Sequence, residues 1–228
     1  MPAPSGAAGV RAVVFDVGET LVDETAEYGG WADWLGVPRH TFSAVFGAVV
    51  ARGGHHREAL QHFRPGFQLA AERLRRERAG LAERLGEGDL YPDARACLER
   101  LQRLGLLVGV AANQTAQAEA RLRALGLPVD FIATSAGWGV EKPDPAFFDR
   151  VVAACGCPAG EVAYVGDRLD NDVLPALASG MVAVFLRRGP WGHLHAAHPD
   201  AARAHLRVAS LQELADRLAD RGTPLGTR

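Results

Sequence analysis

Short, nearly continuous apolar runs recur along this chain, and segments with helical spacing of apolar residues separate them. The first run, from Val10 to Phe15, ends in Asp16. Such a run is typical of a strand that is buried on both faces, which is the pattern of a parallel sheet. Four further runs of this kind are 106–111, 131–133, 162–165 and 182–186.

The segments between these runs show the spacing and the caps of helices. Gly105 and Gly126 stand where helix C-caps belong, and Asp144 stands at an N-cap with Pro145 at the first helical position. The alternation predicts an α/β fold with a doubly wound parallel sheet. The expected helices are 92–104, 116–125, 144–155, 174–178 and 211–218.

One long segment interrupts the alternation. From 23 to 88 the sequence shows only helical periodicity, at 42–50 and in an amphipathic run at 67–85, whose leucines 69, 74, 81 and 85 are expected to face one way. The segment is too long for an ordinary connection between a strand and a helix. We expect a helical cap at 23–88, an α/β core at 8–22 and 89–222, and flexible termini at 1–7 and 223–228. Ligands of open parallel sheets bind at the carboxyl ends of the strands, where such a cap would lie.

Charge and hydropathy exclude several classes of protein. With 25 Lys and Arg against 27 Asp and Glu, the net charge is −2, so we expect no nucleic-acid partner and no polybasic membrane contact. No stretch approaches the roughly 18 to 20 apolar residues that span a bilayer, and the first residues lack the regions of a signal peptide. We therefore expect a cytoplasmic protein, monomeric or homodimeric. The cysteines at 97, 155 and 157 lack zinc or disulfide spacing, so buried thiols are expected.

Three aspartates follow the predicted strands at their carboxyl ends. Asp16 ends the first run, Asp167 follows the run 162–165 after one glycine, and Asp172 lies five residues further on. Clustered carboxylates repel one another and raise each other's pKa. Such a cluster is usually stabilised by a hard divalent cation, most simply Mg²⁺.

A single lysine, Lys142, stands among 25 basic residues, and the others are all arginine. A bias in codon usage explains the arginines but not the position that keeps lysine. Lys142 lies in the sequence Glu-Lys-Pro-Asp-Pro, which begins at Glu141. Together with the three spaced aspartates, this lone lysine makes a chance arrangement harder to accept.

These motifs, in this order, resemble those of the haloacid dehalogenase-like (HAD) hydrolase superfamily. The resemblance runs from about residue 10 to 215, and the segment at 23–88 resembles the small helical cap that one subgroup carries between its first two motifs. It implies a Rossmann-like core, bound Mg²⁺ and an aspartate nucleophile that accepts a phosphoryl group. The motifs are Asp-Val-Gly-Glu-Thr-Leu at 16–21, Ala-Ala-Asn at 111–113, the lysine motif at 141–145, and Gly-Asp-Arg-Leu-Asp-Asn-Asp at 166–172.

Residue by residue, the resemblance implies that Asp16 attacks phosphorus and becomes an aspartyl-phosphate. Lys142 then places a point charge against the phosphoryl oxygens and Asp16, a task that suits an ammonium better than a planar guanidinium. The implied Mg²⁺ ligands are Asp16, the Gly18 carbonyl, Asp167 and, directly or through water, Asp172. The implied substrate contacts are Thr20, Asn113 and Thr115.

Two positions depart from the pattern of the family. Its phosphatases carry a second aspartate two residues after the nucleophile, as general acid and base, and this chain has Gly18 there. General acid–base catalysis is worth about 10²- to 10⁴-fold in rate, so substrates with good leaving groups are expected. Glu19 is adjacent, but successive side chains of an extended chain point to opposite sides. The second departure is Ala112 in place of a serine or threonine, for which backbone amides near Asn113 or the Thr115 hydroxyl could substitute.

Three functions remain open from the sequence. The first is a Mg²⁺-dependent phosphohydrolase for a small phosphorylated metabolite. The second is a catalytically weak relative that binds a phosphorylated ligand or a protein partner. The third is cleavage of a carbon–halogen or carbon–phosphorus bond. The dehalogenase branch works without metal and lacks the fourth motif seen here, and the phosphonate branch needs a cap lysine, which this chain lacks.

Two further groups of residues stand out. Candidates to face the substrate from the cap are 28, 31, 34, 40, 55, 56 and 57, although core packing is the expected role of the aromatic ones. His193, His195 and His198 follow the last predicted strand and are expected in a surface loop, with a spacing that matches no zinc site.

Overall fold

The computed structural model describes residues 9–221, so the termini predicted to be flexible, 1–7 and 223–228, lie outside the described residues. The described chain divides into two compact units. One contains the residues up to 22 together with those from 90 onward, and the other contains residues 23–89.

The first unit is built on a parallel sheet of six strands in the order β3-β2-β1-β4-β5-β6. Neighbouring strands are parallel throughout, and the order reverses direction at β1, so the predicted doubly wound α/β fold is confirmed. The final strand is only three residues long and was not predicted. The strands are β1 (Ala12–Phe15), β2 (Leu107–Ala112), β3 (Phe131–Thr134), β4 (Val162–Gly166), β5 (Val182–Leu186) and β6 (Leu206–Val208).

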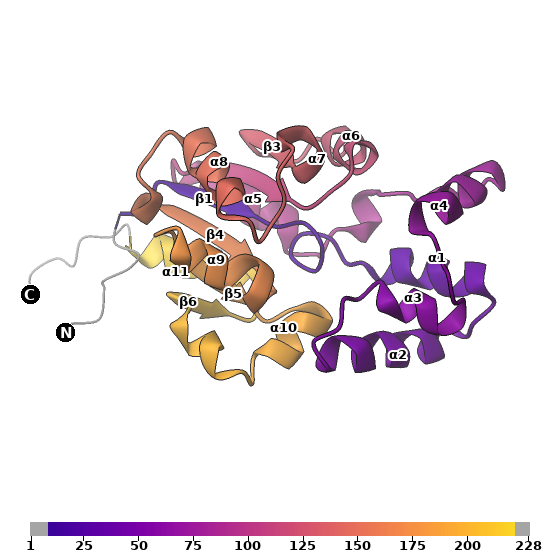
Figure 1. Cartoon of the computed structure of the whole chain (residues 1–228). Coiled ribbons are helices and arrows are strands. Elements are labelled where there is room, and N and C mark those ends of the chain that lie inside the picture. The colour runs from indigo at the N-terminus through magenta and orange to yellow at the C-terminus, as the bar shows by residue number, and fades with distance from the viewer. Residues whose placement is uncertain (1–8, 222–228) are drawn as a thin grey trace, which may run out of the picture. The chain divides into compact units, whose positions relative to one another are not determined.

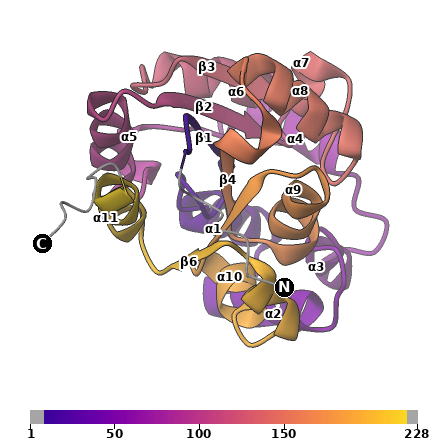
Figure 2. The same cartoon turned by 90° about the vertical axis from the view of Figure 1, so that its left-hand side faces the viewer.

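Helices cover both faces of this sheet (Figure 1). The helices α5 (Ala94–Arg103) and α11 (Leu211–Arg221) lie side by side on one face, and α8 (Pro145–Cys155) and α9 (Leu174–Ala178) lie on the other (Figure 2). Because both faces are covered, β1, β4 and β5 are buried along their whole lengths, which explains their continuous apolar sequences. The remaining helices of this unit are α6 (Ala116–Ala124), α7 (Ser135–Trp138), α10 (Gly189–His195) and the short helical turns Ala159–Glu161, Leu169–Val173 and Pro199–Arg203.

The cysteines of this unit are free thiols, and the predicted burial is confirmed for Cys97 and Cys155 but wrong for Cys157. Cys97 and Cys155 are buried, and burial raises the pKa of both thiols to about 12. Cys157 is half-buried. Among the described residues, no helix has the length and apolar character needed to cross a membrane.

The second unit is helical, and none of its residues 23–89 lies in a strand. Its core is aromatic: Trp31 meets Phe67 edge to face at 5.6 Å, and Phe42 stacks on Phe63 at the same centroid distance. Trp31 is therefore a core residue. The elements are α1 (Thr25–Leu35), α2 (Arg39–Ala51), α3 (Glu58–Phe63), α4 (Leu69–Arg78) and the turn Glu87–Asp89.

The prediction of one amphipathic helical run at 67–85 is wrong in two respects. The helix α4 ends at Arg78, before Gly80 with its φ of 75°. Leu74 and Leu81 do not face a core, since they are 53% and 54% exposed. The buried face of α4 instead carries Glu72, whose carboxylate accepts a hydrogen bond from Trp34 Nε1 at 2.7 Å, and Arg76, whose guanidinium lies 4.2 Å from the Trp31 ring centre. Leucine spacing alone missed this face because its charged residues have aromatic partners on α1.

The prediction of a surface loop after β5 is also wrong. The chain forms the helix α10, with Pro190 in its first turn and Trp191 buried, and then returns to the sheet as β6. His193 and His195 lie on this helix rather than in a loop. His198 follows it, and its side chain caps the turn Pro199–Arg203 by accepting a hydrogen bond from Asp200 N–H.

A glycine in β2 sets the packing between two strands and gives a test of the fold. A Cβ atom at Gly109 would lie 2.3 Å from the Phe131 ring of β3. We expect Gly109→Ala to lower the free energy of unfolding by about 1–3 kcal/mol, because the half-buried Phe131 ring, which packs against the core, must move. Urea unfolding followed by circular dichroism measures the loss. Gly160→Ala is the control, since its Cβ would make only an ordinary contact at 3.9 Å. Equal stabilities of the two variants would contradict this packing.

Candidate active site

Three buried carboxylates meet at the carboxyl edge of the sheet. Asp16 follows β1 and Asp167 follows the neighbouring strand β4, while Asp172 lies in the turn Leu169–Val173. One oxygen of each lies within 4.8 Å of the others, and their exposed fractions are 9%, 1% and 0%. The structure thus brings together the three side chains that the sequence singled out as metal ligands.

Local packing fixes the third of these carboxylates. A Cβ atom at Gly166 would lie 2.4 Å from Asp172 Cγ, so only glycine leaves room for this side chain beside the end of β4. The backbone N–H of Arg168 donates to Asp172 Oδ2 at 3.1 Å, and Asp172 N–H donates to the Arg168 carbonyl at the same distance. The turn therefore closes on the side chain of Asp172.

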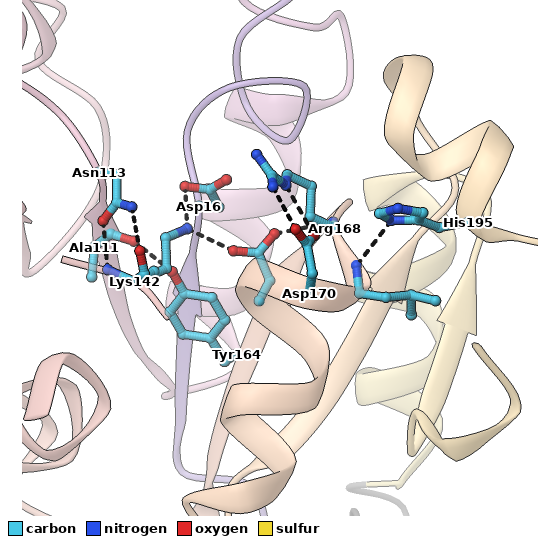
Figure 3. Close-up of polar contacts among 10 residues, drawn as sticks. Asp16, Ala111, Asn113, Lys142, Tyr164, Arg168, Asp170 and His195 are labelled. Atoms are coloured by element: carbon cyan, nitrogen blue, oxygen red, sulfur yellow. Dashed lines mark hydrogen bonds and ion pairs between the residues drawn. The ribbon is translucent and has the colours of Figure 1, made fainter. Parts of the chain in front are cut away.

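Lys142 lies between two of the carboxylates. Its Nζ is 2.7 Å from Asp16 Oδ1 and 2.6 Å from Asp172 Oδ1, and 5.4 Å from the centre of the Tyr164 ring (Figure 3). Burial opposes the charge, but the two carboxylates hold the pKa of Lys142 well above its ordinary value. The lone lysine of the sequence is therefore a buried ammonium at the centre of the cluster.

The cluster retains an excess of negative charge. Burial raises the pKa of Asp172 to about 6; the ammonium of Lys142 opposes this shift, and the charge of Asp16 adds to it. Three carboxylates against one ammonium offer the hard oxygen ligands that Mg²⁺ prefers. These residues therefore fit a magnesium ion. Gly18, whose carbonyl was predicted as a further ligand, is half-buried two residues after Asp16.

Asn113 holds the backbone of the lysine. Its Oδ1 accepts a hydrogen bond from Lys142 N–H at 2.8 Å, and its Nδ2 donates to the Lys142 carbonyl at 2.9 Å (Figure 3). The amide was predicted to contact substrate, and that remains a prediction. Its visible task is to connect the end of β2 to the peptide of Lys142.

Tyr164 is a site residue that the sequence did not reveal. It lies in β4, and its buried hydroxyl donates to the Ala111 carbonyl at 2.7 Å while its ring faces the ammonium of Lys142. One feature of the sequence could have indicated this residue, namely a tyrosine within the otherwise aliphatic run at 162–166.

The other predicted substrate contacts have different surroundings. Thr115 is exposed, and its hydroxyl accepts a hydrogen bond from Ala118 N–H as the N-cap of α6. Thr20 is fully buried, its carbonyl accepts from Arg188, and its hydroxyl has no hydrogen-bond partner within residues 9–221. Contact of either threonine with substrate stays a prediction.

Glu19 occupies a strained position next to Gly18. It has a φ of 52°, and its buried carboxylate accepts a hydrogen bond from the Tyr91 hydroxyl at 2.5 Å. A Cβ atom at Gly189 would lie 2.6 Å from this side chain. The carboxylate of Glu19 is thus committed to Tyr91, which agrees with the expectation that it does not replace the missing aspartate.

Known proteins resemble this chain in sequence. A family model described as haloacid dehalogenase-like hydrolase matches residues 10–180. The chain is 32% identical to a phosphoserine phosphatase of Thermus thermophilus over 173 residues, which are 73% of this chain and 67% of that protein. It is 34% identical to a glyceraldehyde 3-phosphate phosphatase of Methanopyrus kandleri over 113 residues, 48% of each chain. The chain spans about half the length of several curated relatives that it matches.

A solved structure shares the fold. The crystal structure of a dehalogenase with an intermediate complex superimposes with a TM-score of 0.68 and covers 92% of this chain and 98% of its own, at 23% identity. At this identity the match shows the architecture and not the reaction.

The two hydrogen bonds between the Asn113 side chain and the Lys142 backbone give a test of the site. We expect Asn113→Ala to lower kcat by between about tenfold and a hundredfold, because the ammonium is displaced when its peptide loses both hydrogen bonds. Steady-state phosphate release measures this. Gln114→Ala is the matched control, since its backbone carbonyl, not its side chain, makes the hydrogen bond with Ser135. A normal kcat in Asn113→Ala would show that Lys142 does not need these two hydrogen bonds.

Proposed function

Because the chain belongs to the haloacid dehalogenase-like hydrolases, we propose that it is a Mg²⁺-dependent phosphohydrolase that acts on a small phosphorylated metabolite. The observation that carries the proposal is the convergence of three carboxylates, Asp16, Asp167 and Asp172, two of which bind the ammonium of Lys142. Relatives named as phosphatases support it.

In this proposal Asp16 is the nucleophile. Lys142 engages Asp16 Oδ1, which orients the carboxylate and leaves Oδ2 to attack phosphorus. The attack forms a bond between Oδ2 and phosphorus, breaks the bond to the leaving oxygen, and gives an aspartyl-phosphate. Water then attacks that phosphorus, releases inorganic phosphate and restores the carboxylate.

The residues proposed to hold Mg²⁺ are Asp16, Asp167, Asp172 and the carbonyl of Gly18. A bound Mg²⁺ ion supplies charge neutralisation that lets an anionic nucleophile approach an anionic phosphoryl group. Lys142 adds a fixed positive charge on the same side of the nucleophile. Both oxygens of Asp172 already accept a hydrogen bond, one from Lys142 and one from Arg168 N–H. These two donors therefore set the orientation in which the Asp172 carboxylate would face the ion.

The proposed substrates have good leaving groups. Gly18 offers no carboxylate where the family places its general acid, and the carboxylate of Glu19 is bound to Tyr91. A sugar 1-phosphate or an acyl phosphate needs little protonation of its leaving oxygen. These two substrate classes are therefore the ones that the site supports best.

The same proposal covers the role of the helical unit, the place where the protein acts and its partners. Residues 23–89 form a separate helical unit, which supports a role as a cap that selects the substrate. We propose that the protein acts in the cytoplasm on a soluble substrate, as a monomer or homodimer, without nucleic acid or membrane as a partner. A dehalogenase reaction fits less well, because the metal-type cluster of Asp16, Asp167 and Asp172 is present.

Replacement of the lone lysine tests the proposal. We expect Lys142→Arg to lower kcat/KM by at least about a hundredfold, because a wider guanidinium cannot replace an ammonium enclosed by Asp16, Asp172 and Tyr164. Phosphate release from acetyl phosphate and from glucose 1-phosphate, with and without Mg²⁺, measures the effect. Arg187→Lys is the control for a basic substitution at an exposed position. Wild-type turnover in Lys142→Arg, or turnover in Asp16→Asn, would contradict the proposed chemistry.

A second candidate function is the binding of a phosphorylated ligand or partner with little turnover. The sequence favours it at two positions, since Gly18 lacks the acid–base carboxylate and Ala112 lacks the phosphoryl-binding hydroxyl. Both positions lie at the carboxyl edge of the sheet beside Asp16 and Asn113.

Turnover by the wild type, measured together with that of the variant Gly18→Asp, separates the two functions. In a slow phosphohydrolase this variant is expected to raise turnover of alkyl phosphates about a hundredfold, because a carboxylic acid then protonates the poor leaving group. Gly18→Asn, which has the same shape without the acid, is the control and is expected to show no gain. If the wild type hydrolyses no phosphate yet melts at a higher temperature with a phosphorylated ligand, and Gly18→Asp gains turnover, the binding function is the correct one.

A further inference from the structure

The helix α10 contacts the chain segment that separates two of the proposed metal ligands. His195 Nδ1 accepts a hydrogen bond from the backbone N–H of Leu169 at 3.1 Å (Figure 3). Four positions earlier on the same helix, the Trp191 ring lies 4.8 Å from the guanidinium of Arg168. Residues 168 and 169 lie between Asp167 and Asp172, so α10 reaches this segment through two independent contacts.

The hydrogen bond to Leu169 has a specific place in the turn. Leu169 is the first residue of the helical turn Leu169–Val173, and the first N–H groups of a helix have no acceptor within it. Leu169 is buried, so its N–H needs an acceptor from elsewhere in the protein. His195 supplies that acceptor, while Arg168 N–H is already bound to Asp172 Oδ2.

The side chain of Arg168, the residue before Leu169, also holds this segment against α10. Arg168 donates to Asp170 through Nε at 3.1 Å and through Nη2 at 2.6 Å, while its guanidinium lies over Trp191. The segment is therefore held from the α10 side, and its opposite side carries Asp172 with its bond to Lys142. Burial lowers the pKa of His195, and the neutral ring keeps the lone pair at Nδ1 that this bond requires.

We propose that His195 is a positioning residue for the metal site: its bond to Leu169 N–H fixes the chain segment 167–172, which carries both Asp167 and Asp172. This rests on the proposed function, because it takes these carboxylates as Mg²⁺ ligands. It also distinguishes the three histidines of this region. His195 holds the segment 167–172 through Leu169 N–H, His198 caps a turn of its own, and His193 is exposed on α10.

The test is the affinity for Mg²⁺ without substrate. The dissociation constant is measured by isothermal titration calorimetry and by the Mg²⁺-dependent rise in melting temperature. We expect His195→Leu and the smaller His195→Ala to raise this constant at least about tenfold, as the loss of groups that orient metal ligands does. His195→Asn places an amide oxygen near the position of Nδ1, so its constant is expected within about threefold of the wild type. His193→Leu makes the same change on the exposed side of the helix and is expected to leave the constant unchanged.

The variants separate positioning from general stability. Rescue by His195→Asn is not expected if the ring only fills space. The proposal is overturned if His195→Leu and His195→Ala bind Mg²⁺ as tightly as the wild type, or if His195→Asn binds it as weakly as they do. In both cases Mg²⁺ binding and turnover by the wild type leave the phosphohydrolase function intact. If the wild type binds no Mg²⁺, the metal-dependent function fails, and this proposal fails with it.

Discussion

The contact of one buried ammonium with two buried carboxylates is the interaction on which the rest of the site depends. Asp16, Asp167 and Asp172 lie too close together to be ionised at no cost, and Lys142 offsets only part of their repulsion. A buried ion pair is stable only while each partner keeps its geometry. The surrounding structure supplies that geometry, through the amide of Asn113 on the lysine backbone and through the turn that closes on Asp172.

The order of the strands makes this arrangement possible. The strand β1 lies between β2 and β4, so Asp16 has the residues after β2 on one side and those after β4 on the other. The order of a doubly wound sheet reverses at such a point, and the loops on its two sides diverge and leave room for a ligand. Two glycines serve close packing here: Gly109 lies beneath the Phe131 ring, and Gly166 lies against Asp172. The same sheet therefore forms both the hydrophobic core and the charged edge.

Predictions from the sequence succeeded where the signal was local and repeated. The five predicted strands and the flanking helices of the α/β unit are present, because continuous apolar runs and helical spacing report burial directly. The failures also have physical reasons. The strand β6 has three residues, too few for a pattern, and α10 has a sequence of glycine, proline and histidine that resembles a loop. In the helical unit, Leu74 and Leu81 gave a periodicity, yet Glu72 and Arg76 are the buried residues of α4.

The sequence by itself determined the fold class and the identity of the charged residues, because strand-end aspartates and a single lysine can be recognised without knowledge of distant contacts. Only the tertiary structure decided how those residues are held. Asn113 and Lys142 are 29 positions apart, and His195 and Leu169 are 26 apart, so their hydrogen bonds depend on which strands are neighbours in the sheet and where α10 packs. The sequence around these residues does not predict either hydrogen bond. The structure thus shows which hydrogen bonds hold the predicted lysine and the segment that carries the predicted ligands.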